Sequence, residues 1–133
     1  MPFVIDASVA ASWLLPDEGH ASAAAAYRRL RSDHALVPGL WWFEVRNIFV
    51  ISERRGRLDG EQTRKALALL GSLPIQQDLE PDEAAVLRLA RQHRLTVYDA
   101  FYLELAQREN LGLATLDAEL ARAASNEGVD LIN

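Results

Sequence analysis

The chain contains no cysteine. This absence excludes disulfide frameworks, thiolate zinc sites and a cysteine nucleophile. Basic charge is also in short supply, because 14 Lys and Arg side chains stand against 19 Asp and Glu, giving a formal net charge of −5. A protein that coats polyanions without selectivity would carry the opposite excess. We therefore expect no disulfide scaffold, no zinc finger and no general polyanion binder.

Long hydrophobic runs are missing as well. No apolar stretch approaches the roughly 20 residues that span a bilayer, and the first six residues, MPFVID, lack the basic flank and cleavage site of a signal peptide. We therefore expect a cytoplasmic protein that makes no membrane contact. The 133 residues, half of them hydrophobic, suit one domain that buries a core.

Short apolar segments alternate with longer helical stretches along the chain. The predicted strands are 2–5, 35–38, 74–78, 111–115 and 129–132. The predicted helices are 7–15, 18–30, 40–55, 59–73, 81–93, 98–109 and 117–125. This alternation is typical of a parallel sheet with helices on both faces. The predicted fold class is therefore α/β, a three-layer α/β/α sandwich with a central parallel sheet.

Two of the predicted strands lead directly into an aspartate. Asp6 follows the first strand, and Asp117 follows the strand that ends near Thr115. Ligands of open parallel sheets bind beyond the carboxyl ends of the strands, so neighbouring strands would bring both carboxylates to one edge. The alternative is that each aspartate caps the helix after it. Capping would not exclude a second role at a ligand site.

Glu44 and Asp99 are two further acids in apolar surroundings. Glu44 shares one helical face with Trp41 and Val45, and no basic side chain follows one turn later on that face. A carboxylate there is costly unless a cation or hydrogen-bond donors compensate it, so pairing with a distant arginine is the alternative to a site role. Asp99 stands near a predicted helix start, where capping is the alternative. Glu104 is expected on a solvated helix face.

If Asp6, Glu44, Asp99 and Asp117 converge, their like charges repel, and a divalent ion relieves that repulsion. Ligation by oxygen alone favours Mg²⁺ or Mn²⁺ over Zn²⁺. Such an ion lowers the pKa of a bound water and stabilises charge on a phosphodiester. These four acids are therefore the candidate catalytic and metal-binding residues.

Competing catalytic motifs are absent from the sequence. The three histidines show no metal-ligand spacing and are expected at the surface: His20, His34 and His93. Neither a phosphate loop of the GxxxxGK type nor a GxSxG elbow occurs.

Four segments carry a resemblance to a known family: residues 4–9 (VIDASV), 43–47 (FEVRN), 98–102 (YDAFY) and 113–117 (LATLD) followed by Leu120 and Ala121. In this order they resemble the PIN-domain ribonucleases, and more narrowly the VapC-type toxins of bacterial type II toxin–antitoxin pairs. The resemblance covers nearly the whole chain, and it implies a single PIN-like nuclease domain over residues 1–133.

The resemblance also implies an activity, a site and partners. The activity is metal-dependent hydrolysis of RNA phosphodiesters by an endoribonuclease with Mg²⁺ or Mn²⁺ as cofactor. The four acids would form the metal site, with Ser8 and Thr115 as supporting hydrogen-bonding residues. The implied partners are the RNA substrate, a cognate antitoxin protein and a second copy in a homodimer.

Basic residues near the Glu44 motif are candidate contacts to RNA or antitoxin. Arg46 lies inside the motif, and Arg54, Arg55 and Arg57 follow the same predicted helix. Arginine suits bidentate contacts to phosphate. For the cluster at the helix end, the alternative is a solvated end favoured by the helix dipole.

Other functions are less compatible with the sequence. A receiver-type phosphoacceptor domain needs an adjacent acidic pair after the first strand and a late lysine, but Ala7 follows Asp6 and the single lysine is Lys65. A haloacid dehalogenase-like phosphatase needs a second aspartate where Ser8 stands. Two alternatives remain open: a PIN-type RNA-processing nuclease that is not a toxin, and a non-catalytic module that binds proteins through the aromatic run 41–43.

Overall fold

A parallel sheet between two groups of helices forms the centre of the computed structural model, which describes residues 1–16 and 19–133. The strands in these residues are β1 (Phe3–Ile5), β2 (Ala35–Pro38), β3 (Ile75–Asp78) and β4 (Gly112–Ala114). The helices are α1 (Ala7–Leu14), α2 (Ala21–Arg29), α3 (Leu40–Arg54), α4 (Gly60–Gly71), α5 (Glu83–His93), α6 (Val97–Arg108) and α7 (Ala118–Asn126).

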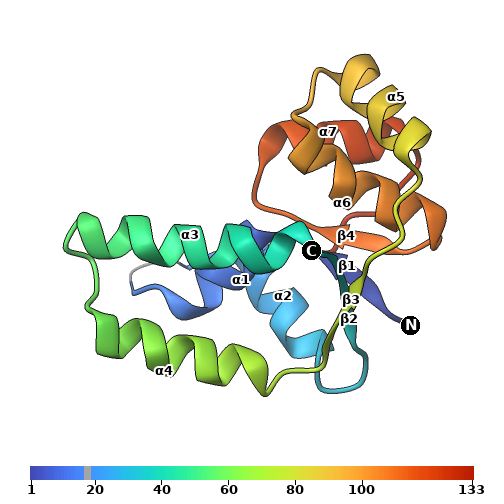
Figure 1. The fold of residues 1–133 in the computed structure, drawn as a ribbon. Coiled ribbons are helices and arrows are strands. Elements are labelled where there is room, and N and C mark those ends of the chain that lie inside the picture. The colour runs from blue at the N-terminus through green and yellow to red at the C-terminus, as the bar shows by residue number, and fades with distance from the viewer. Residues whose placement is uncertain (17–18) are drawn as a thin grey trace.

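The strand order is β3-β2-β1-β4, and every pairing is parallel. Strand β1 is central and fully buried, with Phe3 opposite Ala35 on one side and Gly112 on the other. Helices α5, α6 and α7 lie on one side of the sheet, and α1 and α2 lie on the other with α3 packed against α1 (Figure 1). The predicted three-layer α/β/α sandwich is confirmed.

Local capping explains where several helices begin and end. Helix α4 starts with a capping box in which Asp59 and Gln62 exchange hydrogen bonds of 2.8 Å. After α3 the chain turns at Gly56, whose φ of +72° is accessible to glycine at little cost. The helix predicted over residues 40–55 therefore ends within one residue of the observed helix.

One predicted strand and one predicted helix start need correction, and a second predicted helix start lies outside the described residues. Residues 129–132 make only an isolated bridge between Leu131 and Leu113, because β4 ends at Ala114 and the ladder does not continue. Helix α5 starts after Pro81, because the Asp82 side chain accepts from the Ala85 N–H and sets the cap there. The predicted start of α2 at residue 18 lies outside the described residues.

Two polar side chains expected at the surface are buried instead. Glu104 is 2% exposed and accepts from Arg108 Nε at 2.6 Å. His93 is 7% exposed, with its Nε2 2.7 Å from Glu127 Oε2. The prediction for both was wrong because each has a charged partner, which makes burial tolerable.

Across the described part of the chain, no helix combines the length and the apolar character that a bilayer crossing requires.

Candidate functional site

The carboxyl ends of the two neighbouring strands β1 and β4 bring the first site residues together. Ile5 is paired with Ala114, so Asp6 and Thr115 follow at the same edge of the sheet. The Asp6 N–H donates to the Ala114 carbonyl at 3.1 Å, and the Thr115 hydroxyl donates a short hydrogen bond to Asp6 Oδ2. Parallel pairing therefore joins residues that are 109 positions apart in the sequence.

Ser8 and Thr115 hold the Asp6 carboxylate from two sides. Ser8 Oγ donates to Asp6 Oδ1 at 2.6 Å and accepts from the Leu116 N–H at 3.1 Å. Thr115 Oγ1 in turn accepts from the Asp117 N–H at 3.0 Å. Asp6 is only 5% exposed. The contacts with Ser8 and Thr115 hold its carboxylate in one orientation.

Two of the three predicted aspartates cap helices, and the third does not. Asp6 Oδ1 accepts from the Val9 N–H at 3.1 Å, and Asp117 Oδ1 accepts from the Leu120 N–H at 2.9 Å. Asp99 lies in the first turn of α6, but the cap of that helix is Thr96, whose Oγ1 accepts the Asp99 N–H at 3.1 Å. Capping is therefore no explanation for the Asp99 carboxylate.

Glu44 meets a hydroxyl rather than a cation. The Tyr102 hydroxyl of α6 donates to Glu44 Oε1 of α3 at 2.5 Å across the site. Burial and then the Glu44 contact raise the pKa of Tyr102 far above its ordinary value, so the phenol remains a donor. Tyr102 belongs to the segment 98–102, but its contact with Glu44 was not predicted from the sequence. Its position one turn after Asp99, on the buried side of a helix, was the available signal.

The acids influence one another electrostatically. Burial raises the pKa of Asp6, and the charge of Asp117 adds to that rise. Burial also raises the pKa of Glu44, with further contributions from Asp99 and Asp6, while the Tyr102 hydrogen bond opposes it. The pKa of Asp99 is raised by burial, then by Asp117 and Asp6. The structure thus brings all four predicted acids within electrostatic reach.

No cation balances these charges in the described residues, where none of the four carboxylates forms an ion pair with Lys, Arg or His. Within residues 1–16 and 19–133, no three His, Cys, Asp or Glu side chains lie close enough together to hold a metal ion as a group. Mg²⁺ keeps several waters and takes one or two carboxylates, so it does not need such a cage. The donor set, which is all oxygen with uncompensated negative charge, fits a hard divalent ion.

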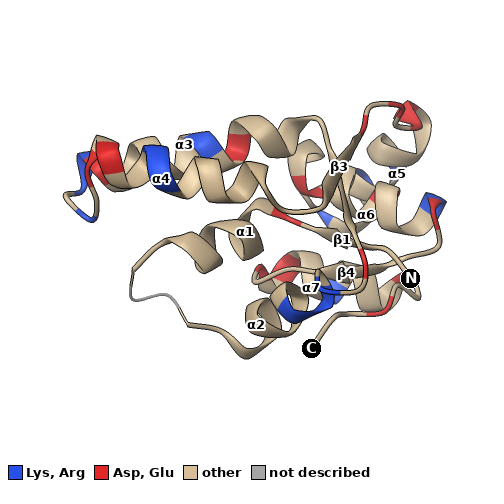
Figure 2. Cartoon of the chain, turned by 90° about the horizontal axis from the view of Figure 1, so that it is seen from below, with Lys and Arg blue, Asp and Glu red and all other residues tan. Residues whose placement is uncertain are grey.

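The predicted arginine contacts lie at different distances from the acids. Arg54 and Arg55 are exposed at the end of α3, about 15 Å along the helix axis from Glu44. That end projects away from the sheet together with α4 (Figure 1), and it carries basic and acidic segments side by side (Figure 2). Arg46 is closer, within one turn of Glu44, and its guanidinium lies 4.0 Å from the centre of the Trp42 ring.

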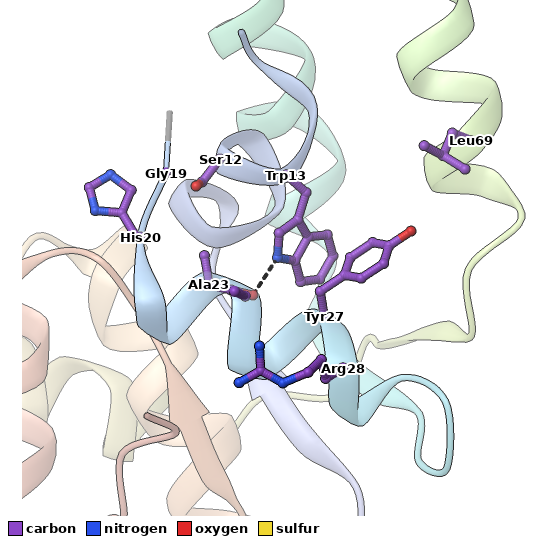
Figure 3. Close-up of a pocket in the computed structure, with 9 residues that line it drawn as sticks. Ser12, Trp13, Gly19, His20, Ala23, Tyr27, Arg28 and Leu69 are labelled. Carbon is purple, nitrogen blue, oxygen red and sulfur yellow. Dashed lines mark hydrogen bonds between the residues drawn. The ribbon is translucent and has the colours of Figure 1, made fainter. Parts of the chain in front are cut away.

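Two hollows differ in their relation to the acids. The first, of about 390 Å³, is lined by residues of α1, α2 and α4, and Trp13 Nε1 there donates to the Ala23 carbonyl at 2.7 Å (Figure 3). None of the four acids lines it. The second, about 470 Å³, is the α3 hollow, lined by Trp42, Phe43, Glu44, Arg46, Asn47 and Val50. One candidate acid, Glu44, is part of its wall.

Comparison with known proteins connects this arrangement to a family. Residues 3–126 match the PIN domain. Ribonuclease VapC3 of Pyrobaculum aerophilum is 34% identical over 125 residues, which cover 91% of this chain and 93% of that protein.

Solved structures share the same fold. The crystal structure of PAE2754 from Pyrobaculum aerophilum is 25% identical, with a TM-score of 0.71 over 92% of this chain and 84% of that one. A toxin-antitoxin complex from Klebsiella pneumoniae contains a chain that is 18% identical, with a TM-score of 0.57 over 86% of each chain.

Proposed function

Because the chain belongs to the PIN-domain family and to its VapC-type ribonucleases, we propose that it is a metal-dependent endoribonuclease that acts as the toxin of a toxin–antitoxin pair. The proposed catalytic and metal-binding residues are Asp6, Glu44, Asp99 and Asp117. Residues 1–133 would then form a single nuclease domain that acts in the cytoplasm.

One observation carries this proposal. Asp6, Glu44 and Asp99 have raised pKa values from burial and mutual repulsion, and no basic side chain in the described residues pairs with them. Folding does not favour such an arrangement by itself, because like charges in a partly buried site destabilise the chain. Acids whose pKa values are perturbed in this way are common at functional sites. A site for a divalent cation supplies a physical reason for them.

Of the four acids, one or two would hold Mg²⁺ or Mn²⁺ directly through carboxylate oxygens, and the others would act through water that the ion retains. When bound, the ion supplies Lewis acidity and neutralises charge that develops on the phosphodiester. Ser8 and Thr115 keep the Asp6 carboxylate in one orientation through their hydroxyls. Tyr102 positions Glu44 and favours its ionised form by donating a hydrogen bond.

The proposed partners are RNA, a cognate antitoxin and a second copy of the chain. The antitoxin is suggested by the relative from Klebsiella pneumoniae, which is described as part of a toxin-antitoxin complex. The RNA substrate is suggested by the relative named a ribonuclease. Homodimer formation comes from the family resemblance alone.

The central test is the substitution Asp6→Asn, assayed on single-stranded RNA with Mn²⁺ or Mg²⁺. We expect cleavage by the parent chain that stops with a chelator, and a loss of at least about 100-fold in the variant, because removing a metal-held carboxylate removes several kcal/mol of transition-state stabilisation. Asn remains a good N-cap, so α1 should still form.

Asp59→Asn is the matched control, since Asp59 also caps a helix but lies on α4. It should cleave RNA like the parent chain. Cleavage retained by Asp6→Asn, or cleavage that persists in chelator, would contradict the proposed site. Growth arrest on expression of the parent chain, but not of Asp6→Asn, would distinguish a toxin from an RNA-processing nuclease.

A further inference from the structure

We propose that the α3 hollow is a nucleotide subsite, in which an unpaired base of the substrate stacks on Phe43 and an adjoining phosphate pairs with Arg46. This inference rests on the proposed nuclease function and adds to it the residues that select and orient one nucleotide beside the acids.

Two aromatic rings at the start of α3 are exposed. Trp42 is 44% exposed and Phe43 is 69% exposed, although both are large apolar side chains. Their ring centres lie 5.1 Å apart at an interplanar angle of 71°, so they support each other edge to face. Phe43 therefore presents an open ring to solvent, with Trp42 as its aromatic neighbour. Unpaired nucleic-acid bases bind to such rings by stacking.

Beside these rings, Arg46 is a cation that is held in place and has no acidic partner among the described residues. The Arg46 guanidinium lies 4.0 Å from the Trp42 ring centre, and its Nη1 donates to the Trp42 carbonyl at 3.2 Å. Among the described residues, no carboxylate forms an ion pair with it. Burial lowers the pKa of Arg46, but an arginine stays charged at neutral pH. The contacts with Trp42 orient the guanidinium in advance, and its other N–H donors can meet a phosphate.

The α3 hollow is continuous with the candidate site. Glu44 lines the α3 hollow, and it is also the acid that Tyr102 holds and that Asp6 and Asp99 influence. A nucleotide in the hollow would therefore lie next to the phosphodiester at the acids. The chain has a net charge of −5, which repels a polyanion such as RNA. An oriented guanidinium beside the acids would offset that repulsion locally.

The test measures binding rather than cleavage, with the full chain carrying Asp6→Asn so that RNA stays intact. The probe is a short single-stranded oligoribonucleotide with one 2-aminopurine base, moved along the sequence in a series. We expect Phe43→Ala to weaken binding about 5- to 100-fold, the range for loss of one base–aromatic stack. We also expect it to abolish the quenching of 2-aminopurine at one probe position, whereas Phe43→Trp should retain both.

Two further variants sharpen the assignment. Arg46→Ala should lower the slope of log affinity against log salt by about 0.7, the value for one phosphate contact on a single strand. Leu69→Ala is the matched control, because Leu69 is 47% exposed on α4 and lines the other hollow. It should bind the probe within about 2-fold of the parent affinity, since it loses no stack.

The outcomes separate the subsite from the nuclease function. Unchanged affinity and quenching in Phe43→Ala would overturn the subsite, while metal-dependent cleavage by the parent chain would leave the proposed function standing. A parent chain that neither binds nor cleaves RNA would overturn both. If sedimentation shows that Phe43→Ala converts a dimer to a monomer, the hollow is a contact between copies and the subsite is overturned.

Discussion

At the scale of single residues, the Tyr102 hydroxyl is the contact that decides how readily Glu44 ionises. It donates to Glu44 Oε1 at 2.5 Å, and this hydrogen bond lowers the pKa of a carboxyl that burial, Asp99 and Asp6 raise. A hydrogen bond to the charged form of an acid favours that form. The phenol therefore acts on the site without carrying charge itself.

Tyr102→Phe should raise the pKa of Glu44 further and weaken Mn²⁺ binding near neutral pH. A hydrogen bond to a charged group contributes about 1.5–3 kcal/mol, so we expect a loss of affinity of roughly 10-fold or more. Since a divalent ion needs the deprotonated acid, the affinity–pH curve should move to higher pH. Calorimetric titration with Mn²⁺ across a pH series measures this shift.

Tyr27→Phe is the control for this change, because Tyr27 lies on α2 and lines the hollow that contains none of the four acids. Its curve should match that of the parent chain. A Tyr102→Phe curve that also matches the parent would show that the hydroxyl does not set the ionisation of Glu44.

At the scale of elements, Arg108 connects the end of α6 to the edge strand β3. Its Nε is 2.6 Å from Glu104, and its Nη1 is 3.1 Å from Asp78 of β3. Glu104 also accepts the Asp82 N–H at the start of α5, at 3.2 Å. Because Glu104 is 2% exposed, its charge depends on this arginine. The ion pairs therefore fix the position of α6, the helix that carries Asp99 and Tyr102.

Arg108→Ala should reduce the free energy of unfolding by about 3 kcal/mol, because it leaves a buried carboxylate without a cation. Urea denaturation measures the loss. Arg122→Ala is the control, since its partner Glu119 is 70% exposed, and it should cost under about 0.5 kcal/mol. Adding Glu104→Gln to Arg108→Ala should recover part of the loss. Failure of that recovery would show that the arginine contributes by packing rather than by charge.

At the scale of the whole molecule, the raised carboxyl pKa values link stability, pH and the proposed metal. In the ion-free chain, an acid whose folded pKa lies above its unfolded value contributes stability at low pH. That contribution is lost as pH rises through the folded pKa. A bound divalent ion has the opposite dependence, because it needs the carboxylates deprotonated.

We therefore expect Mn²⁺ to raise the thermal midpoint more at about pH 7.5 than at about pH 5, where protons compete for the acids. At 100 times the dissociation constant, one bound ion adds about 2.7 kcal/mol, which is several degrees for a chain of this size. Calorimetry with Mn²⁺ and with chelator tests this prediction. In Asp6→Asn the increment should disappear, and an equal increment at both pH values would contradict the link.

The sequence alone determined the fold class and the identity of the candidate acids. Short apolar segments typical of strands alternate with longer segments typical of helices, and this pattern can be read from the sequence. An aspartate that directly follows a predicted strand can be recognised in the same way. Parallel pairing then brings those strand ends to one edge, which is why Asp6 and Asp117 could be predicted to lie near each other, whereas Thr115 was named through the family resemblance.

Only the tertiary structure decided how each charge is compensated. Tyr102 reaches Glu44 across 58 positions, Glu104 and His93 are buried beside charged partners, and the α3 hollow leaves Phe43 open to solvent. These features depend on side-chain contacts between different helices and strands. The periodicity of a single segment carries no information about such contacts. Which residues are buried can be predicted from the order of apolar and polar residues in the sequence. The partner of a buried polar group depends on how the elements pack against one another.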